Sequence, residues 1–273
     1  MRNVLRANLW RLVKSRAFHL ALAAMLAYTA LIVLVCWDHY ATGTGSYTLE
    51  SVLTAGFGLM GYLTIPSLIM APLLALYLGT EYGEHTLRNK LTVGHTRTEI
   101  YLADLATCIL AAVGLDLLSL LLAGALCVYP VMGMSGVLLR ASPGQVLAWI
   151  ATALLARAAW AAVMKLLTAS MSSPSAAAVA ALLLVVLASL LCSYGFRQME
   201  YLVHRMADGT AVENGEARLA FWQFLLDLLP TGQSLQVSRL DTPNLWRLPL
   251  LSLGVAAAST GAGLVLFHKK DLK

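Results

Sequence analysis

Two long apolar segments flank a short polar one, and this arrangement most restricts what the chain can fold into. Residues 51–80 contain no charged side chain, and residues 100–129 contain only Asp104 and Asp116. The hydrocarbon core of a bilayer is about 30 Å thick, which takes about 20 helical residues to cross. Each apolar segment is therefore long enough to span a membrane, and the polar residues 79–101 are predicted to form a loop at one membrane face.

The composition of the whole chain is also that of a membrane protein. Hydrophobic residues make up 59% of it and charged residues 12%, against about 45–50% and about 25% in soluble domains. A backbone in hydrocarbon must satisfy its own hydrogen bonds, and the alternating strands of a barrel are absent. We therefore predict an all-α membrane protein with a single transmembrane domain over residues 1–273. Its six expected spans cover residues 17–37, 52–79, 100–129, 146–168, 176–196 and 248–268.

The distribution of basic residues predicts how these spans are oriented. Lysines and arginines near the ends of spans favour the cytoplasm, and they gather in three segments: Arg2, Arg6, Arg11, Lys14 and Arg16; Arg88, Lys90 and Arg97; and Lys269, Lys270 and Lys273. Both termini and the loop at 80–99 are therefore expected in the cytoplasm, and the segment 197–244 outside. Anionic lipid headgroups account for the formal net charge of +5, so we expect membrane lipid and no nucleic acid as a partner.

Two segments outside the spans have a helical pattern. In residues 1–16, Leu5, Leu9 and Leu12 fall on one helical stripe with Trp10 nearby. This favours a helix in the cytoplasmic interface, although a basic flank that only sets the topology explains the charges equally well. Residues 220–229 are too few to span a bilayer and are expected to form a helix at the outer leaflet that ends at Pro230.

Asp116 and Arg157 are the charges that most need a partner, because an unpaired charge near the centre of a span costs about 2.5–3.5 kcal/mol. Both lie at similar depth below the connection that joins the third and fourth spans, so we predict an ion pair between them. Its role stays open between fixing two helices together and serving a polar substrate path or a conformational switch. Asp104 and Lys165 can form a second, wetter pair nearer the cytoplasm, unless Lys165 extends to the headgroups.

The chain shows no sign of an enzyme that acts by itself. It has neither a GxxxxGK[ST] phosphate loop nor an HExxH zinc motif, and we expect no catalytic residue, metal or cofactor. Residues 133–136 match the GxSG motif of rhomboid proteases. However, Ser135 is expected outside and His268 inside, whereas a nucleophile and its base must approach to about 3 Å.

The polar loop carries a more informative pattern. Its residues Glu81, Tyr82, Thr86, Leu87, Arg88, Lys90, Leu91, Gly94, His95, Thr96, Arg97 and Tyr101 follow E-[FY]-x-x-G-T-[LI]-R and then G-x-[ST]-R, with His85 where glycine is frequent. This pattern resembles the first cytoplasmic loop of ABC type-2 exporter permeases. The basic N-terminal helix, the six spans, the long external segment and the ending at 267–272 resemble that family as well.

The resemblance implies a permease subunit that pairs with a second copy or a paralogue and docks a separate cytoplasmic ATPase, which binds ATP and Mg²⁺. It implies ATPase coupling by the residues Glu81, Glu84, Leu87, Arg88, Lys90, Leu91 and Arg97. It also implies export of an amphipathic, lipid-like or peptide substrate, such as an antimicrobial peptide or a drug, across a bacterial plasma membrane. The alternative is a non-transporting sensor or immunity module that binds a ligand through its external segment.

Overall fold

The computed structural model describes residues 1–41, 65–83, 86–128, 142–171, 173–209, 214–238 and 246–269, and within them every regular element is an α-helix. The helices are α1 (Arg2–Lys14), α2 (Arg16–Ala41), α4 (Ile65–Gly83), α5 (Thr86–Thr92), α6 (Arg97–Val128), α7 (Pro143–Ser170), α8 (Pro174–Ala207), α9 (Gly215–Leu228), α10 (Pro230–Ser238) and α11 (Arg247–Lys269). Among these, α2, α6, α7, α8 and α11 are long and apolar enough to cross a membrane. The prediction of an all-α, multi-pass membrane protein is confirmed at this level.

The bounds of the predicted spans agree with the helices to different degrees. Helices α2, α6, α7 and α11 match four predicted spans to within a few residues. The span predicted at 52–79 lies partly outside the described residues, and the apolar part of α4, Ser67–Glu81, is shorter than a full span. Helix α8 continues to Ala207, well past the predicted end at 196, because the end of an apolar run is not the end of a helix. It stops just before Gly209, which has a positive φ of 70°.

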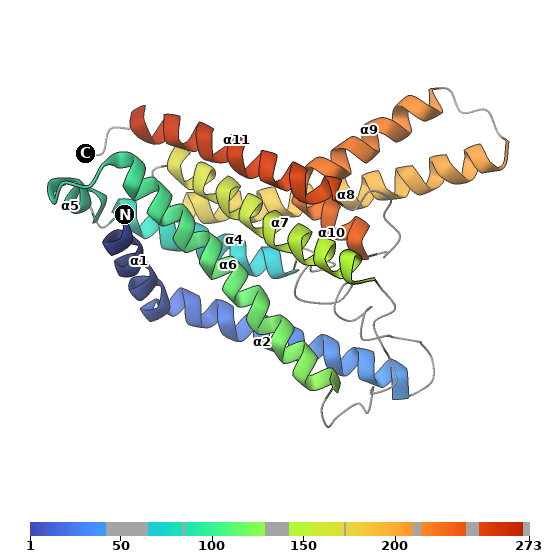
Figure 1. The fold of residues 1–273 in the computed structure, drawn as a ribbon, viewed down its shortest axis with the longest axis horizontal. Helices are drawn as coiled ribbons and strands as arrows, with labels where there is room; N and C mark the ends of the chain where they lie inside the picture. Colours follow the sequence, from blue (N-terminus) through green and yellow to red (C-terminus); the bar gives the residue numbers. More distant parts are fainter. Residues whose placement is uncertain are drawn as a thin grey trace.

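The helices form a central group with two branches (Figure 1). Helix α7 packs along α11, and α4 packs along α8. Helices α2 and α6 lie side by side below this group in the view of Figure 1. Helices α8 and α9 form a hairpin that projects from the group, at the end away from α1 and α5. Helices α1 and α5 and the last turn of α11 meet at one end of the molecule. The start of α1, helix α5 and the end of α11 thus share one end of the molecule.

Local sequence explains where the central helices begin and how closely they pack. Ser142 and Gln145 form a capping box at the start of α7, and Ser173 accepts a hydrogen bond from the backbone of α8 in its first turn. Alanines fill much of the buried surface between α4, α7 and α8, which lets the backbones approach closely. At Gly79 a Cβ atom would lie 2.6 Å from the Cα of Pro174, so α4 meets the start of α8 at a position that requires glycine.

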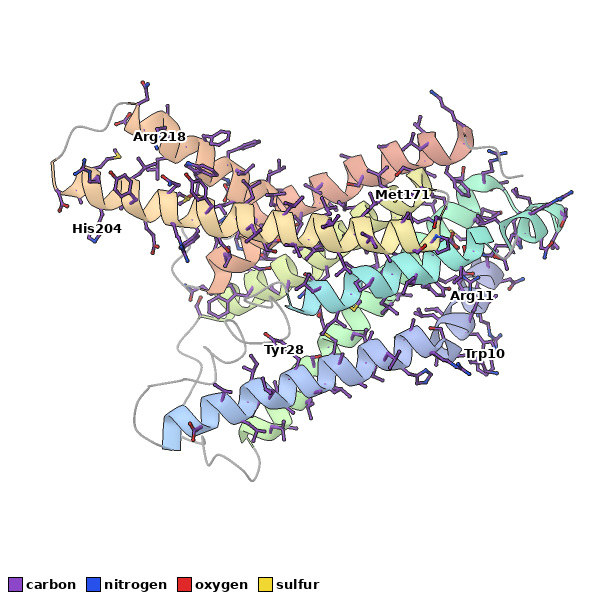
Figure 2. All side chains as sticks on the ribbon, turned by 180° about the vertical axis from the view of Figure 1, so that it is seen from behind. Trp10, Arg11, Tyr28, Met171, His204 and Arg218 are labelled. Atoms are coloured by element: carbon purple, nitrogen blue, oxygen red, sulfur yellow. The ribbon has the colours of Figure 1, made fainter. Side chains whose placement is uncertain are left out.

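Helix α1 packs on the bundle through a face that the leucine pattern does not indicate. Its buried residues are Val4, Asn8 and Leu12, whereas Leu5 and Leu9 are only partly covered. Trp10 is exposed and lies at the opposite end of the molecule from His204 and Arg218 (Figure 2). Of the leucine stripe, only Leu12 belongs to the face that packs on the bundle, where Asn8 has buried hydrogen-bond partners. The interfacial position of α1 stays a prediction.

In its described residues, the segment predicted to be external contains the end of α8 and then α9 and α10, where one short helix at 220–229 was expected. Helix α9 begins earlier, at Gly215, and Pro230 starts α10 after a break at Leu229. Trp222 packs on α8, with its ring centroid 5.5 Å from that of Tyr194, and Gly195 leaves the room for the indole. Phe221 remains exposed. The aromatic residues of α9 therefore serve partly to fasten the hairpin and partly to cover its outer surface.

Candidate functional site

Helix α5 lies between the ends of the longer helices instead of hanging free as a loop. Leu87 is only 3% exposed and packs with Ile100, Tyr101 and Phe267, which belong to α6 and α11. Thr86 Oγ1 donates a hydrogen bond to the backbone oxygen of Glu81 at 3.1 Å and so ties the start of α5 to α4. These contacts place one face of α5 inside the bundle and leave the other outside.

A buried carboxylate joins α5 to α4 and α1. Glu81, near the end of α4, is 1% exposed. Its Oε1 accepts a hydrogen bond from Lys90 Nζ of α5 at 2.7 Å and also pairs with the Arg11 guanidinium of α1. Arg11 lies over the ring of Tyr77 with 4.7 Å to its centroid. Burial lowers the pKa of Arg11, but Glu81 and Tyr77 raise that pKa by more, so it lies above its ordinary value.

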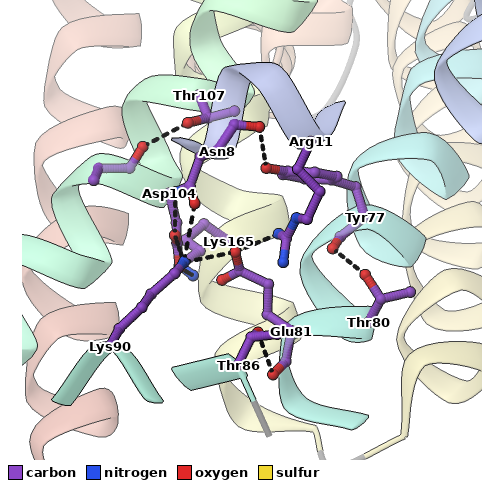
Figure 3. A network of polar contacts seen from close by, with 11 residues as sticks. Asn8, Arg11, Tyr77, Thr80, Glu81, Thr86, Lys90, Asp104, Thr107 and Lys165 are labelled. Atoms are coloured by element: carbon purple, nitrogen blue, oxygen red, sulfur yellow. Dashed lines mark hydrogen bonds and ion pairs between the residues drawn. The ribbon is translucent and has the colours of Figure 1, made fainter. Parts of the chain in front are cut away.

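A second carboxylate continues the network into the bundle (Figure 3). Asp104 of α6 is fully buried, and its Oδ2 accepts a hydrogen bond from Lys165 Nζ of α7 at 2.7 Å. Its Oδ1 accepts from Asn8 Nδ2 at 2.8 Å and from Lys90 Nζ at 3.4 Å. Lys90 therefore contacts both carboxylates, and Asp104 connects α6 with three other helices.

Asn8 holds the N-terminal helix on this network. Its Oδ1 accepts from Lys90 Nζ at 3.0 Å, and its backbone oxygen accepts from the Tyr77 hydroxyl at 2.8 Å. We call the group formed by Asn8, Arg11, Glu81, Lys90, Asp104 and Lys165 the ionic cluster. Removing one partner of a buried ion pair typically costs about 3–5 kcal/mol. The ionic cluster is therefore expected to keep α1, α4, α5, α6 and α7 together as one unit.

The residues predicted to couple to an ATPase fall into two groups. Glu81 and Leu87 are buried and Lys90 is half-buried, and all three contact neighbouring helices of this chain. Their contact with a partner stays a prediction. A degenerate loop motif does not distinguish a charge that binds a partner from one that binds a neighbouring helix. Arg88 is exposed and Leu91 partly so, which leaves them accessible. Glu84 lies outside the described residues.

Arg97, another predicted coupling residue, binds the end of α11. Its Nη1 donates to the backbone oxygens of Phe267 at 3.3 Å and His268 at 2.7 Å. These carbonyls lie in the last turn of α11 and have no partner within the helix, so a cation satisfies them and offsets the negative end of the helix dipole. Arg97 thus joins the start of α6 to the end of α11.

Asp116 and Arg157, the predicted intramembrane pair, lie together. Arg157 Nε is 2.5 Å from Asp116 Oδ2, and Arg157 Nη1 donates to Ser67 Oγ of α4 at 2.7 Å. The second predicted pair, Asp104 and Lys165, is also formed, but both side chains are fully buried. The expectation of a wetter pair is therefore wrong, because Asn8 and Arg11 of α1 contribute to a buried network at that end.

A further polar group fastens the base of the α8–α9 hairpin. Asp227 pairs with Arg247 and accepts hydrogen bonds from Gln223 and Gln236, both at 3.0 Å. Ser252 of α11 donates to Gln233 Oε1 at 2.6 Å. Sequence reasoning missed this group and the contributions of Asn8 and Arg11. For Asn8 the sequence did carry a signal: Val4, Asn8 and Leu12 are four residues apart, so Asn8 lies between two apolar side chains on one face of α1.

Comparison with known proteins adds no relative to these observations. No family model matches the chain, and no curated protein matches it either. In the part of the chain that the structure describes, no group of three or more His, Cys, Asp or Glu side chains is placed to hold a metal ion. Any functional assignment therefore depends on the sequence pattern and on the geometry of the cluster.

Proposed function

We propose that this chain is the membrane-spanning permease subunit of an ATP-driven exporter of the ABC type-2 kind. The observation that carries the proposal is the attachment of α5. A helix too short to cross the membrane is held by ion pairs of Lys90 to Glu81 of α4 and Asp104 of α6. A hydrogen bond from Lys90 to Asn8 joins it to α1 as well. A force applied to α5 would then be passed directly to the spans.

In this proposal the outer side of α5 binds the ATPase and the inner side transmits its movement. Arg88 and Asn89 are exposed, and Val93 just after α5 is 77% exposed. Val93, an apolar side chain near the polar Arg88 and Asn89, is suited to bind in a groove on a partner protein. A few buried side chains of this kind supply most of the affinity of an interface. Lys90 and Leu87 instead fix α5 to the bundle, so that docking and transmission are assigned to different residues of one helix.

The remaining parts of the proposal come from the family resemblance. Two such subunits, identical or paralogous, would pair in a bacterial plasma membrane, and the partner ATPase would bind ATP and Mg²⁺. The substrate would be amphipathic, lipid-like or a peptide. The apolar helices and the absence of a phosphate-binding loop in this chain agree with that division of work.

Affinity purification of the full chain from its own cells in mild detergent tests the proposal. We expect an ATPase to be recovered in stoichiometric amount and Arg88→Glu to abolish its recovery. Arg218→Glu is the matched control, because it makes the same change at an exposed arginine near the tip of the hairpin. Recovery of the chain without an ATPase, both with and without added ATP, would contradict the proposal of an exporter.

Lys90→Met separates docking from transmission. Because Lys90 faces the carboxylates and not the outside, we expect this variant to keep its ATPase but to lose transport. Transport can be followed as protection of cells against a panel of amphipathic drugs and antimicrobial peptides. Loss of the ATPase from Lys90→Met but not from Arg88→Glu would reverse the assignment of the two faces.

One observation favours the alternative of a non-transporting sensor or immunity module. The α8–α9 hairpin projects beyond the helix group and exposes Tyr201, Phe221 and Phe224. A surface of this kind suits an amphipathic ligand outside the cell. Purification without an ATPase, together with ligand binding that Phe221→Ala weakens, would support this second function.

A further inference from the structure

Helix α1 has a second face, opposite the one that holds Asn8 on the bundle. Arg2, Arg6, Trp10 and Lys14 follow one another at intervals of four residues, so they form a stripe along one side of the helix. We call these four residues the outer stripe of α1. All of them are exposed, and Trp10 is exposed by 64%. Because a large apolar ring gains free energy by leaving water, this exposed indole marks the outer stripe as a contact surface.

The outer stripe combines an apolar surface with cations. Leu9, Trp10 and Val13 line a shallow, open hollow of about 750 Å³, and Arg6 lines it as well. Lys14 Nζ lies 4.2 Å from the ring centroid of Trp10, so this side chain leans back along the helix towards Arg6, as helical side chains commonly do. Such a surface suits a molecule that has both an apolar and an anionic part.

The described chain offers no negative charge to these cations. In the residues that the structure describes, Arg2, Arg6 and Lys14 form no ion pair. On the other side of α1, the ionic cluster contains three cations and two carboxylates, and both carboxylates are already paired. A partner that brings negative charge therefore complements the outer stripe.

Chain connectivity places the outer stripe beside a helix that can cross a membrane. Only Ser15 separates α1 from α2, which is apolar and long enough to span a bilayer from Arg16 onwards. Leu20, in the second turn of α2, is 72% exposed, and α1 runs across the direction of the long helices (Figure 1). A phospholipid next to the start of α2 therefore has its headgroup within reach of the outer stripe.

We infer that the outer stripe of α1 binds an anionic phospholipid, with the phosphate near Arg6 and Lys14 and the upper part of the acyl chains against Trp10. Lysine and arginine at a membrane surface attract anionic headgroups, and an indole favours the depth of the headgroups. A phospholipid, unlike a soluble anion, supplies both the negative charge and the apolar part that the hollow accommodates.

The outer stripe lies on a different face of α1 from the predicted stripe of Leu5, Leu9 and Leu12. Lipid bound there also decides between the two explanations of the basic segment, because a flank that only sets the topology needs no bound lipid. Asn8 and Arg11 join α1 to the ionic cluster, so a lipid on the outer stripe would hold α1 against the bundle from the other side. No ATPase is required, and the exporter proposal is not needed for this binding.

Quenching of Trp10 fluorescence by brominated lipid tests the inference. The full chain in micelles of a neutral detergent is titrated with phosphatidylglycerol that is brominated on its acyl chains near the glycerol. The difference between the unmodified chain and Trp10→Phe isolates the emission of Trp10. We expect phosphatidylglycerol to quench this emission saturably, and brominated phosphatidylcholine, whose headgroup has no net charge, to quench it far more weakly. Inorganic phosphate at equal ionic strength should not displace the lipid, because it lacks the apolar part.

Arg6→Gln/Lys14→Gln tests the role of the cations. The affinity for phosphatidylglycerol should fall about 30-fold, the effect of losing two cations beside an anionic headgroup. Arg218→Gln/Lys269→Gln is the matched control, because it removes the same charge from two exposed positions outside α1 and should leave the affinity unchanged. Thermal unfolding without lipid verifies that both variants are folded. Saturating phosphatidylglycerol should raise the unfolding midpoint of the unmodified chain and of the control, and raise that of Arg6→Gln/Lys14→Gln much less.

Three results would overturn the inference. Equal quenching by the two lipids would mean that Trp10 enters any lipid without recognising the headgroup. An equal loss of affinity in the two double variants would mean that the net charge of the chain, and not the outer stripe, attracts the lipid. Absence of quenching by either lipid would mean that water or a protein covers Trp10. None of these results bears on the recovery of an ATPase with Arg88, so this inference and the proposed function can fail separately.

Discussion

Lys165 shows how a basic side chain is accommodated in the interior of an apolar helix bundle. Its ammonium group donates to Asp104 Oδ2 at 2.7 Å and lies 5.2 Å from the ring centroid of Tyr101 and 5.7 Å from that of Phe267. A carboxylate and two aromatic faces replace much of the water that the cation loses on burial. Asp104 and Tyr101 lie on α6 and Phe267 lies on α11, so this environment of Lys165 exists only in the folded bundle.

Replacing Lys165 should therefore destabilise the whole bundle. Lys165→Met removes the cation and leaves Asp104 buried with weaker partners, which should cost about 3 kcal/mol of unfolding free energy. Denaturation in mixed micelles measures this change. Lys269→Met, at an exposed position of α11, is the control and should have almost no effect. Equal stability of the two variants would show that the ion pair does not hold the bundle together.

At the scale of residues, the sequence predicts the ion pairs of charges that lie in apolar segments. It does not predict which polar side chains of a charged segment are buried. Asp116 and Arg157 could be paired in advance because each is a charge in an apolar segment at matching depth. Glu81 and Lys90 stand in a segment rich in charges, where nothing in the sequence shows which of them turn inward. The burial of Asn8 was harder still to predict from the sequence, since an uncharged amide in a basic helix is as common on the surface as in a buried contact.

The contact between α6 and α11 depends on the absence of one side chain. At Gly263 a Cβ atom would overlap the hydroxyl of Tyr101 and lie 2.7 Å from its Cζ. Tyr101 itself is fully buried. The absence of a side chain at Gly263 therefore makes room for Tyr101, and Arg97 of the same helix binds the end of α11.

Gly263→Ala should loosen this contact. Because the new methyl group forces the tyrosine or the helix to move, we expect a loss of about 1–3 kcal/mol in unfolding free energy. Gly261→Ala is an unusually close control, since it lies on the same helix and its Cβ would meet nothing within 4 Å. That variant should be neutral or slightly stabilising, as alanine favours a helix over glycine. Similar losses in both would argue against the close approach.

At the scale of elements, the positions of most spans were predictable and the lengths of the helices were not. Hydropathy locates α2, α6, α7 and α11 because burial in lipid requires an apolar run. It does not locate the end of α8, since the helix continues through Arg197, Glu200 and Arg205, which all tolerate a helix but not a bilayer. It also misses α10, whose buried glutamines depend on partners in α9 and α11.

At the scale of the molecule, the arrangement predicts opposite accessibility of its two ends. Val93 lies beside α5, and Arg218 lies in α9 near the tip of the hairpin. If the basic end is cytoplasmic, a membrane-impermeant maleimide should label Arg218→Cys in intact cells and Val93→Cys only after permeabilisation. The unmodified chain provides the background from its own cysteines. The reverse labelling pattern would show that the orientation predicted from lysines and arginines is wrong.

The two ion pairs between α6 and α7 also have a consequence for how the chain is made. Asp104 and Asp116 both lie on α6, which is synthesised before α7 brings Lys165 and Arg157. Before α7 is made, Asp104 has only Asn8 and Lys90 as partners. Asp116 has no charged partner at that stage and costs about 2.5–3.5 kcal/mol in lipid. We therefore expect α6 to wait at the translocon until α7 arrives, and the two helices to leave it laterally as a neutral hairpin.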